Sequence, residues 1–216
     1  MTPVLQVFAR APVAGACKTR LIPALGAAGA ASLQENLVRR TLATAAQWRG
    51  ATAGATVQLW CAPASTHPFF ADCARAFGVA LRDQADGGLG ARMWLALVDA
   101  LRDGRTPVLV GTDCPWLDAA AIGALFAALA RAECAAIPAL DGGYVAIGLA
   151  RAVPELFAGV DWGSARVMAQ TRARARRARA VLHAATPLPD VDVPGDLARL
   201  RADPALAPLV PAAMTA

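Results

Sequence analysis

The chain has 216 residues, of which 56% are hydrophobic and 17% are charged, and its formal net charge is +5. A chain of this length and composition can bury a sizeable core, which excludes extensive disorder and a scaffold that depends on disulfides. Charged residues interrupt every apolar stretch before the roughly 18 residues needed to cross a bilayer, so we expect no membrane span.

Short aliphatic runs alternate with Ala- and Leu-rich stretches of helical period, which predicts one α/β/α sandwich domain over residues 1–216 with a mainly parallel sheet. The expected strands are Val4–Ala9, Thr56–Cys61, Val79–Arg82, Pro107–Gly111, Cys134–Ala139, Tyr144–Leu149 and Val181–Ala184. The expected helices are Gly29–Trp48, Ser65–Phe77, Leu89–Arg102, Asp118–Arg131, Ser164–Arg179 and Pro194–Arg201. Ser65, Asp118 and Ser164 are expected N-caps, because each precedes an apolar run of helical period. Ligands of such sheets bind beyond the carboxyl ends of the strands.

The cysteines and arginines suggest a setting but no partner. The five cysteines are Cys17, Cys61, Cys73, Cys114 and Cys134. Their odd number and wide spacing favour reduced thiols and give no zinc motif, and the absence of a signal-peptide pattern adds to the prediction of a cytoplasmic location. Most basic residues are dispersed, and the arginines between Arg172 and Arg179 point to both sides of a helix. We expect a solvated helix and no nucleic-acid partner, with a surface that binds phosphate or nucleic acid as the alternative.

The first strand is followed by a cation-rich loop, Arg10-Ala-Pro-Val-Ala-Gly-Ala-Cys-Lys-Thr-Arg20. Backbone N–H groups and cations at the end of a strand can hold phosphates, so we expect Arg10, Gly15, Lys18 and Arg20 to bind them. The alternative is an ordinary loop with solvated cations. The loop is not a Walker A motif, because Cys17 stands where that motif needs glycine. Lys18 is the only lysine of the chain, which marks either a need for a compact ammonium or chance.

A second cluster is Val108-Leu-Val-Gly-Thr-Asp113-Cys-Pro115, a buried-type strand that ends next to an acid. Asp113 either binds a divalent cation that bridges substrate phosphates or caps the following turn. Because Pro115 and the separate cap candidate Asp118 reduce the need for a cap, we favour the metal role.

Three further stretches are more ambiguous. Asp141-Gly-Gly-Tyr144 lies between two strands, where Asp141 is either a site residue or an ordinary hairpin residue. In Pro189-Asp190-Val-Asp192-Val-Pro194-Gly-Asp196, Asp192 can cap the last helix, bind a metal, or do both. The loop Asp86-Gly-Gly-Leu-Gly-Ala-Arg92, with Gly88 and Arg92, is suited to approach a base or sugar, although a bare turn is the simpler reading.

Together these stretches resemble a known family. They are, in order, FARAPVAGACKTRL, PALG, GGLGARM, VLVGTDCPWL, PALDGGYVAIGL, LFAGVDWGSARV and DVDVPGDLARL. In order and spacing they resemble a bacterial family of glycosyltransferases with the GT-A nucleotide-diphospho-sugar transferase fold, some of whose members are associated with arsenosugar biosynthesis. The resemblance covers roughly residues 4–201. More distantly the chain looks like a guanylyltransferase of phospholactate activation, which shares the Lys-Thr-Arg-Leu loop, and like sugar cytidylyltransferases, which share the late Val-Asp stretch.

The resemblance implies roles for individual residues. The loop 10–20 would wrap the nucleotide phosphates with Lys18 reaching them, and Asp113 and Asp192 would hold one Mg²⁺ or Mn²⁺. We expect the two carboxylates in one cleft with Lys18 on its opposite lip. The chain departs from the family at Ala16, Val193 and Gly195. Val193 lacks a hydroxyl that could orient Asp192.

The expected function is a metal-dependent glycosyltransferase that uses a nucleotide-diphospho-sugar donor and a small-molecule acceptor. Lys18, Asp113 and Asp141 are the expected catalytic residues, with Asp141 as general base for an acceptor hydroxyl and Tyr144 beside it as a wall or hydrogen-bond partner. The first alternative is nucleotidyl transfer with release of pyrophosphate. The second is a nucleotide-binding domain without turnover. His67 and His183 lie outside the strand-end clusters and are expected to be structural or exposed.

Overall fold

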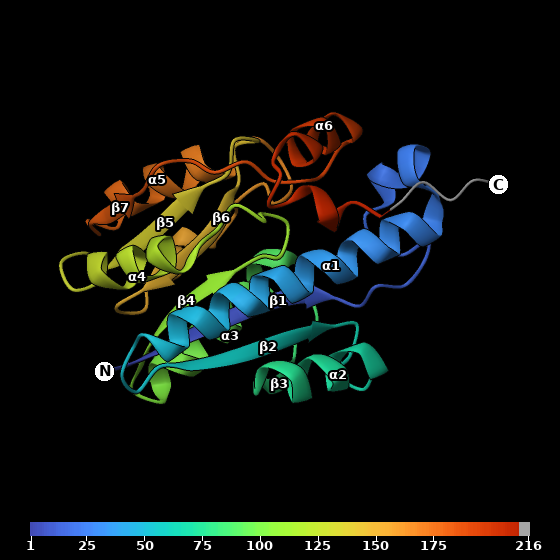
Figure 1. Cartoon of the computed structure of the whole chain (residues 1–216). Coiled ribbons are helices and arrows are strands. Elements are labelled where there is room, and N and C mark those ends of the chain that lie inside the picture. The colour runs from blue at the N-terminus through green and yellow to red at the C-terminus, as the bar shows by residue number, and fades with distance from the viewer. Residues whose placement is uncertain (212–216) are drawn as a thin grey trace.

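The computed structural model describes residues 1–211, in which one sheet of seven strands is flanked by helices on both faces (Figure 1). The strands are β1 (Thr2–Arg10), β2 (Thr56–Ala62), β3 (Ala80–Asp83), β4 (Arg105–Val110), β5 (Cys134–Pro138), β6 (Tyr144–Leu149) and β7 (Leu182–Ala184). Their order is β3-β2-β1-β4-β6-β5-β7, and only β6 runs antiparallel to its neighbours. The α/β/α sandwich with a mainly parallel sheet is therefore confirmed.

Six α-helices and three short 3₁₀ segments complete the described part of the chain. The helices are α1 (Ile22–Gly50), α2 (Pro68–Phe77), α3 (Leu89–Arg102), α4 (Ala119–Ala128), α5 (Val167–Arg177) and α6 (Pro194–Ala202). The 3₁₀ segments are Thr19–Leu21, Pro154–Leu156 and Ala207–Leu209. No helix within residues 1–211 is long and apolar enough to cross a membrane.

The two faces of the sheet have separate hydrophobic cores. Alternate residues of a strand point to opposite faces. Accordingly Val108 of β4 packs in the core beneath α1, α2 and α4, and Leu109 packs in the core beneath α3 and α5. A third cluster joins the start of α1 to α6 through Leu33 and Leu197. Phe8 of β1 and Leu109 of β4 belong to the same core as the buried residues of α3, and both also line the cleft described below.

The register of the sheet brings the functional segments to one edge. Arg10 at the end of β1 lies opposite Ala62 at the end of β2, and Val7 lies opposite Val110 at the end of β4. Tyr144 begins β6 opposite Pro138, where β5 ends. Because β6 runs the other way, its first residue lies at the same edge as the carboxyl ends of the other strands.

Helix starts account for most differences from the sequence-based expectations. Asp118 does cap α4, since its carboxylate accepts from the N–H of Ala121 at 2.7 Å. The prediction for Ser65 is wrong, because α2 begins at Pro68 and the ring of His67 accepts from the N–H of Phe69.

The prediction for Ser164 is also wrong. Its hydroxyl accepts from the N–H of Arg166 in the turn before α5, which starts only at Val167. Helix α1 begins at Ile22 rather than Gly29, because Pro23 fits the first turn of a helix. Gly26 breaks this helix with φ 68° and ψ 167°.

Candidate active site

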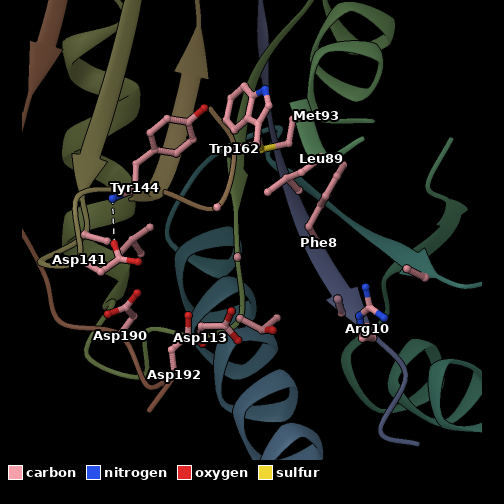
Figure 2. Close-up of a pocket in the computed structure, with 18 of the residues that line it drawn as sticks. Phe8, Arg10, Leu89, Met93, Asp113, Asp141, Tyr144, Trp162, Asp190 and Asp192 are labelled. Carbon is pink, nitrogen blue, oxygen red and sulfur yellow. Dashed lines mark hydrogen bonds between the residues drawn. The ribbon is translucent and has the colours of Figure 1, made fainter. Parts of the chain in front are cut away.

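A cleft of about 620 Å³ opens at the carboxyl edge of the sheet. Its lining includes four cations, Arg10, Lys18, Arg20 and Arg92, and four acids, Asp113, Asp141, Asp190 and Asp192. Figure 2 shows the four aspartates gathered on one side of the cleft, with Arg10 across from them. The cleft therefore offers separate places for an anion and for a cation.

Lys18 lies among the acids. Its ammonium is 2.6 Å from a carboxylate oxygen of Asp113 and 3.0 Å from one of Asp192, and it donates to the carbonyl of Val191 at 2.6 Å. Burial lowers the pKa of Lys18, but the two carboxylates outweigh that effect and hold the pKa above its ordinary value. The backbone of Lys18 is left-handed, at φ 45°, which costs about 1–2 kcal/mol for a residue with a side chain. The contacts of the ammonium offset this cost and fix the side chain.

Asp113 and Asp192 come from distant segments that pack together. Asp113 follows the buried end of β4, and the N–H of Val191 donates to the carbonyl of Asp113 at 2.9 Å. Both carboxylates line the cleft. The expectation that Lys18 occupies the opposite lip is wrong, because its loop returns towards β4 and places the ammonium between the two carboxylates.

Asp192 is not the cap of α6. Val193 holds the N-cap position, and the carboxylate of Asp196 accepts from the N–H groups of both Asp192 and Val193 at 2.9 Å. The side chain of Asp192 is thus available to the cleft. The ammonium of Lys18 donates to it at 3.0 Å and so helps to fix its orientation.

Asp141 and Asp190 extend the acidic side of the cleft. One oxygen each of Asp141, Asp190 and Asp192 lie within 4.8 Å of one another. Asp141 also has the hairpin role, because its Oδ1 accepts from the N–H of Gly143 at 2.8 Å. Burial raises the pKa of Asp190 to about 6, and the charges of Asp141 and Asp192 add to the shift.

Asp190 is a residue that the sequence analysis did not select. The segment Asp190-Val191-Asp192 is a single alternation, in which Val191 is fully buried and both acids line the cleft. A period of two in an extended segment points alternate side chains the same way. The alternation of acid, valine and acid was therefore the sequence signal that could have identified Asp190 as a cleft residue.

Three arginines of the cleft are the phosphate candidates. Arg10 at the end of β1 and Arg20 in the first 3₁₀ segment are exposed and line the cleft. Arg92 lines it from α3 and donates to the side chain of Gln84 at 2.9 Å. Gly15 and Gly88 are not among the lining residues: Gly15 forms a turn at φ 81°, and Gly88 holds the N-cap position of α3.

The inner end of the cleft is apolar and aromatic. Tyr144 and Trp162 pack edge to face with ring centroids 6.1 Å apart, and Phe8, Leu89 and Met93 lie beside them (Figure 2). The hydroxyl of Tyr144 is buried and has no hydrogen-bond partner among residues 1–211, and burial raises the pKa of this phenol well above its usual range. Trp162, which the sequence analysis did not select either, packs against α3.

The contact of Trp162 with α3 depends on a glycine. A Cβ on Gly90 would stand 2.7 Å from Cζ2 of the indole and closer still to Nε1 and Cε2. Only glycine at this position lets the ring approach α3 closely enough to form the wall of the cleft. This contact explains the last glycine of the Gly-Gly-Leu-Gly stretch.

The donor atoms fit a hard divalent cation. Mg²⁺ and Mn²⁺ prefer carboxylate and carbonyl oxygens, which Asp113, Asp192 and Val191 present together. Cys17 is the only cysteine of the chain that lines this cleft, and burial raises the pKa of its thiol, so it remains protonated. The residues present therefore fit Mg²⁺ or Mn²⁺ better than a soft metal.

Comparison with solved structures finds several proteins of the same fold. A "putative nucleotide-diphospho-sugar transferase" from Desulfovibrio desulfuricans G20 has 28% identity and a TM-score of 0.79, over 89% of this chain and 84% of that one. The CTP complex of CMP:2-keto-3-deoxy-manno-octonic acid synthetase has 13% identity and a TM-score of 0.54, over 94% and 98%. The manganese complex of Rv0371c from Mycobacterium tuberculosis H37Rv has 18% identity and a TM-score of 0.50, over 94% and 99%.

These similarities identify the chain as a transferase with the nucleotide-diphospho-sugar transferase fold. Comparison with curated proteins finds no match. One family model matches residues 41–164, a stretch that contains Asp113, Asp141 and Tyr144 and excludes Lys18 and Asp192. The chain belongs to this bacterial family, which is described as "Uncharacterized protein conserved in bacteria (DUF2064)".

Proposed function

We propose that the protein is a metal-dependent glycosyltransferase that takes a nucleotide-diphospho-sugar donor and a small-molecule acceptor. The observation that carries the proposal is the meeting of Lys18, Asp113 and Asp192 in one cleft that is also lined by arginines, with Arg10 across from the acids (Figure 2). The similarity to the Desulfovibrio protein supports the donor class.

The phosphate part of the site would work by charge and position. Arg10 and Arg20 would bind the diphosphate of the donor with guanidinium hydrogen bonds, which are strong because both partners are charged. Asp113 and Asp192 would hold Mg²⁺ or Mn²⁺, which supplies neutralisation of the charge that develops on the leaving diphosphate. The manganese in Rv0371c supports this choice of metal.

The acceptor would bind on the acidic side. Asp141 is the candidate general base for the acceptor hydroxyl. The N–H of Gly143 fixes its carboxylate, and one of its oxygens lies within 4.8 Å of oxygens of Asp190 and Asp192. Tyr144 and Trp162 would form the wall against which the transferred group lies.

A second candidate function is nucleotidyl transfer. The same phosphate-binding arginines and acids would serve an NTP that is attacked by a phosphorylated or acidic small molecule with release of pyrophosphate. The fold shared with a synthetase that binds CTP favours it.

Product identity separates these functions. The protein would be screened by thermal shift against nucleotides and nucleotide sugars with Mg²⁺ or Mn²⁺, because ligands of the folded state raise its apparent stability. Binders would then be incubated with candidate acceptors. Release of nucleoside diphosphate supports glycosyl transfer, and release of pyrophosphate supports nucleotidyl transfer. Binding without either product would contradict both. Asp113→Asn should abolish turnover, whereas Asp118→Asn should retain it, since Asp118 only caps α4 and asparagine is an equally good cap.

A further inference from the structure

Lys18 has no hydrogen-bond donor left for a substrate. A lysine ammonium has three N–H groups. In this structure the three are matched by one oxygen each of Asp113, Asp192 and Val191, at 2.6, 3.0 and 2.6 Å. The side chain is 5% exposed. A lysine held in this way cannot bind a phosphate without leaving its position.

The three oxygens around Lys18 form a cage for a cation. Two are carboxylate oxygens and one is a backbone carbonyl oxygen, and the hydrogen bond from Val191 N–H to the carbonyl of Asp113 ties the two segments together. These are the oxygen types that bind Mg²⁺, at 2.0–2.1 Å. The ammonium fills the centre of the same cage at longer distances, so the cage cannot hold Lys18 and a metal ion at once.

We propose that Lys18 is a displaceable occupant of the metal site: its ammonium holds the cage of Asp113, Asp192 and Val191 in the free protein and moves to substrate phosphate when a divalent cation enters. The exchange balances charge. The cage has two negative charges and one positive charge with Lys18, and it becomes neutral when a divalent ion replaces the ammonium. The released ammonium then meets the charge of the phosphates, so metal and phosphate bind with positive coupling.

This inference rests on the proposed function, because it assigns the order of binding at the same site. Coupling also has a simpler source, since substrate phosphates complete the coordination shell of a weakly held Mg²⁺. The two explanations differ in the role of Lys18. Displacement requires that removal of the lysine improves metal binding in the absence of phosphate, whereas shell completion does not.

The first experiment removes the ammonium. Mn²⁺ affinity is measured by electron paramagnetic resonance, without phosphate, for the wild type, Lys18→Met and Arg20→Met. Arg20→Met is the matched control, because it removes one positive charge from the same loop and the same cleft without touching the cage. We expect Lys18→Met to bind Mn²⁺ at least about tenfold more tightly than the wild type, and Arg20→Met to change affinity by less than about threefold.

The gain should depend on the cage. Lys18→Met with Asp192→Asn should lose the gain in Mn²⁺ affinity. Equal affinities of Lys18→Met and Arg20→Met would overturn the inference, because the effect would then come from the general field of the cleft. So would a gain that survives Asp192→Asn.

A second experiment uses the wild type and needs no variant. Lys18 is the only lysine of the chain, so protein grown with ¹³C-labelled lysine gives a single side-chain Cε signal in NMR spectra. We expect this signal to shift when Mg²⁺ displaces the ammonium, and the shift to occur at lower Mg²⁺ concentration when inorganic pyrophosphate is also present. A signal that stays unchanged while the ³¹P spectrum shows bound pyrophosphate would overturn the inference.

The outcomes separate this inference from the proposed function. If pyrophosphate and nucleotides fail to bind at all, the proposed function fails, and the Mn²⁺ comparison still decides whether Lys18 occupies a metal site. If nucleotides bind and turn over while Lys18→Met gains no affinity for Mn²⁺, the proposed function stands and displacement by Lys18 is wrong.

Discussion

Replacing Gly90 by alanine places a methyl group inside the indole ring of Trp162. The new Cβ would lie 2.7 Å from Cζ2 of that ring and nearer to Nε1 and Cε2. The ring cannot move freely, because its other neighbours are Tyr144, with centroids 6.1 Å apart, and Phe157, at 6.0 Å. The substitution therefore tests both the packing of the core and the wall of the cleft.

Two effects of opposite sign set the magnitude. Alanine is favoured over glycine within a helix by about 0.5–1 kcal/mol. Forcing extra volume into a packed site costs about 1–3 kcal/mol. We expect the second effect to win and Gly90→Ala to lower the free energy of unfolding by about 1 kcal/mol.

A matched control isolates the clash. Gly123 lies within α4, and a Cβ there would meet nothing within 4 Å. Gly123→Ala should therefore raise the free energy of unfolding by about 0.5–1 kcal/mol. Both variants would be measured by urea unfolding followed by circular dichroism, because tryptophan fluorescence would also report the displaced ring. If Gly90→Ala proved as stable as Gly123→Ala, the described contact between Gly90 and Trp162 would be wrong.

Three further predictions concern the cleft. Asp141→Asn keeps the side-chain oxygen that accepts from the N–H of Gly143 but removes the general base, so turnover should fall by about 10²- to 10⁴-fold, while donor binding measured by calorimetry should be nearly unchanged. Unchanged turnover would show that Asp141 is only a hairpin residue. Burial raises the pKa of Asp190 to about 6, so the folded state binds this proton more tightly, and the stability contributed by Asp190 should fall as pH rises from about 4 to 6. In urea titrations with a chelator, the free energy of unfolding of Asp190→Asn should rise relative to that of the wild type across this window, and a constant difference would contradict the shift. Tyr144→Phe removes a buried hydroxyl that has no hydrogen-bond partner within residues 1–211, so the free energy of unfolding should stay the same or rise, while affinity for the nucleotide sugar should fall about three- to tenfold. A loss of stability would show that the hydroxyl is hydrogen-bonded within the protein.

The sequence predicts the parts of the site that follow directly from strand ends. Asp113 sits at the end of a buried apolar run, and the cation-rich loop follows the first strand, so the rule for parallel sheets places both at one edge. The position of Lys18 was predicted correctly only as far as that edge, because it lies between the two carboxylates and not on the opposite lip. Its contact with Asp192 joins residues 174 positions apart and depends on how the last loop packs against β4.

Other features depend on packing that the local pattern does not contain. Helix α1 starts seven residues before the expected Gly29. The sequence analysis missed this first part because the stretch of alanines and glycines after Pro23 has little apolar periodicity and is broken at Gly26. The wall made by Trp162 arises from a contact with Gly90, 72 positions earlier, and neither residue signals it alone. Turn chemistry also misled the prediction for Ser164, whose hydroxyl bonds within the turn.

The location of bound manganese and nucleotide tests the central claim most directly. Crystals would be grown with Mn²⁺ and the nucleotide sugar chosen by thermal shift, and Mn²⁺ would be placed by its anomalous scattering. The account predicts Mn²⁺ at about 2.0–2.4 Å from oxygens of Asp113 and Asp192, with the diphosphate between the metal and the loop that carries Arg10 and Arg20. A nucleotide bound outside this cleft, or Mn²⁺ bound within it without Asp113, would contradict the account.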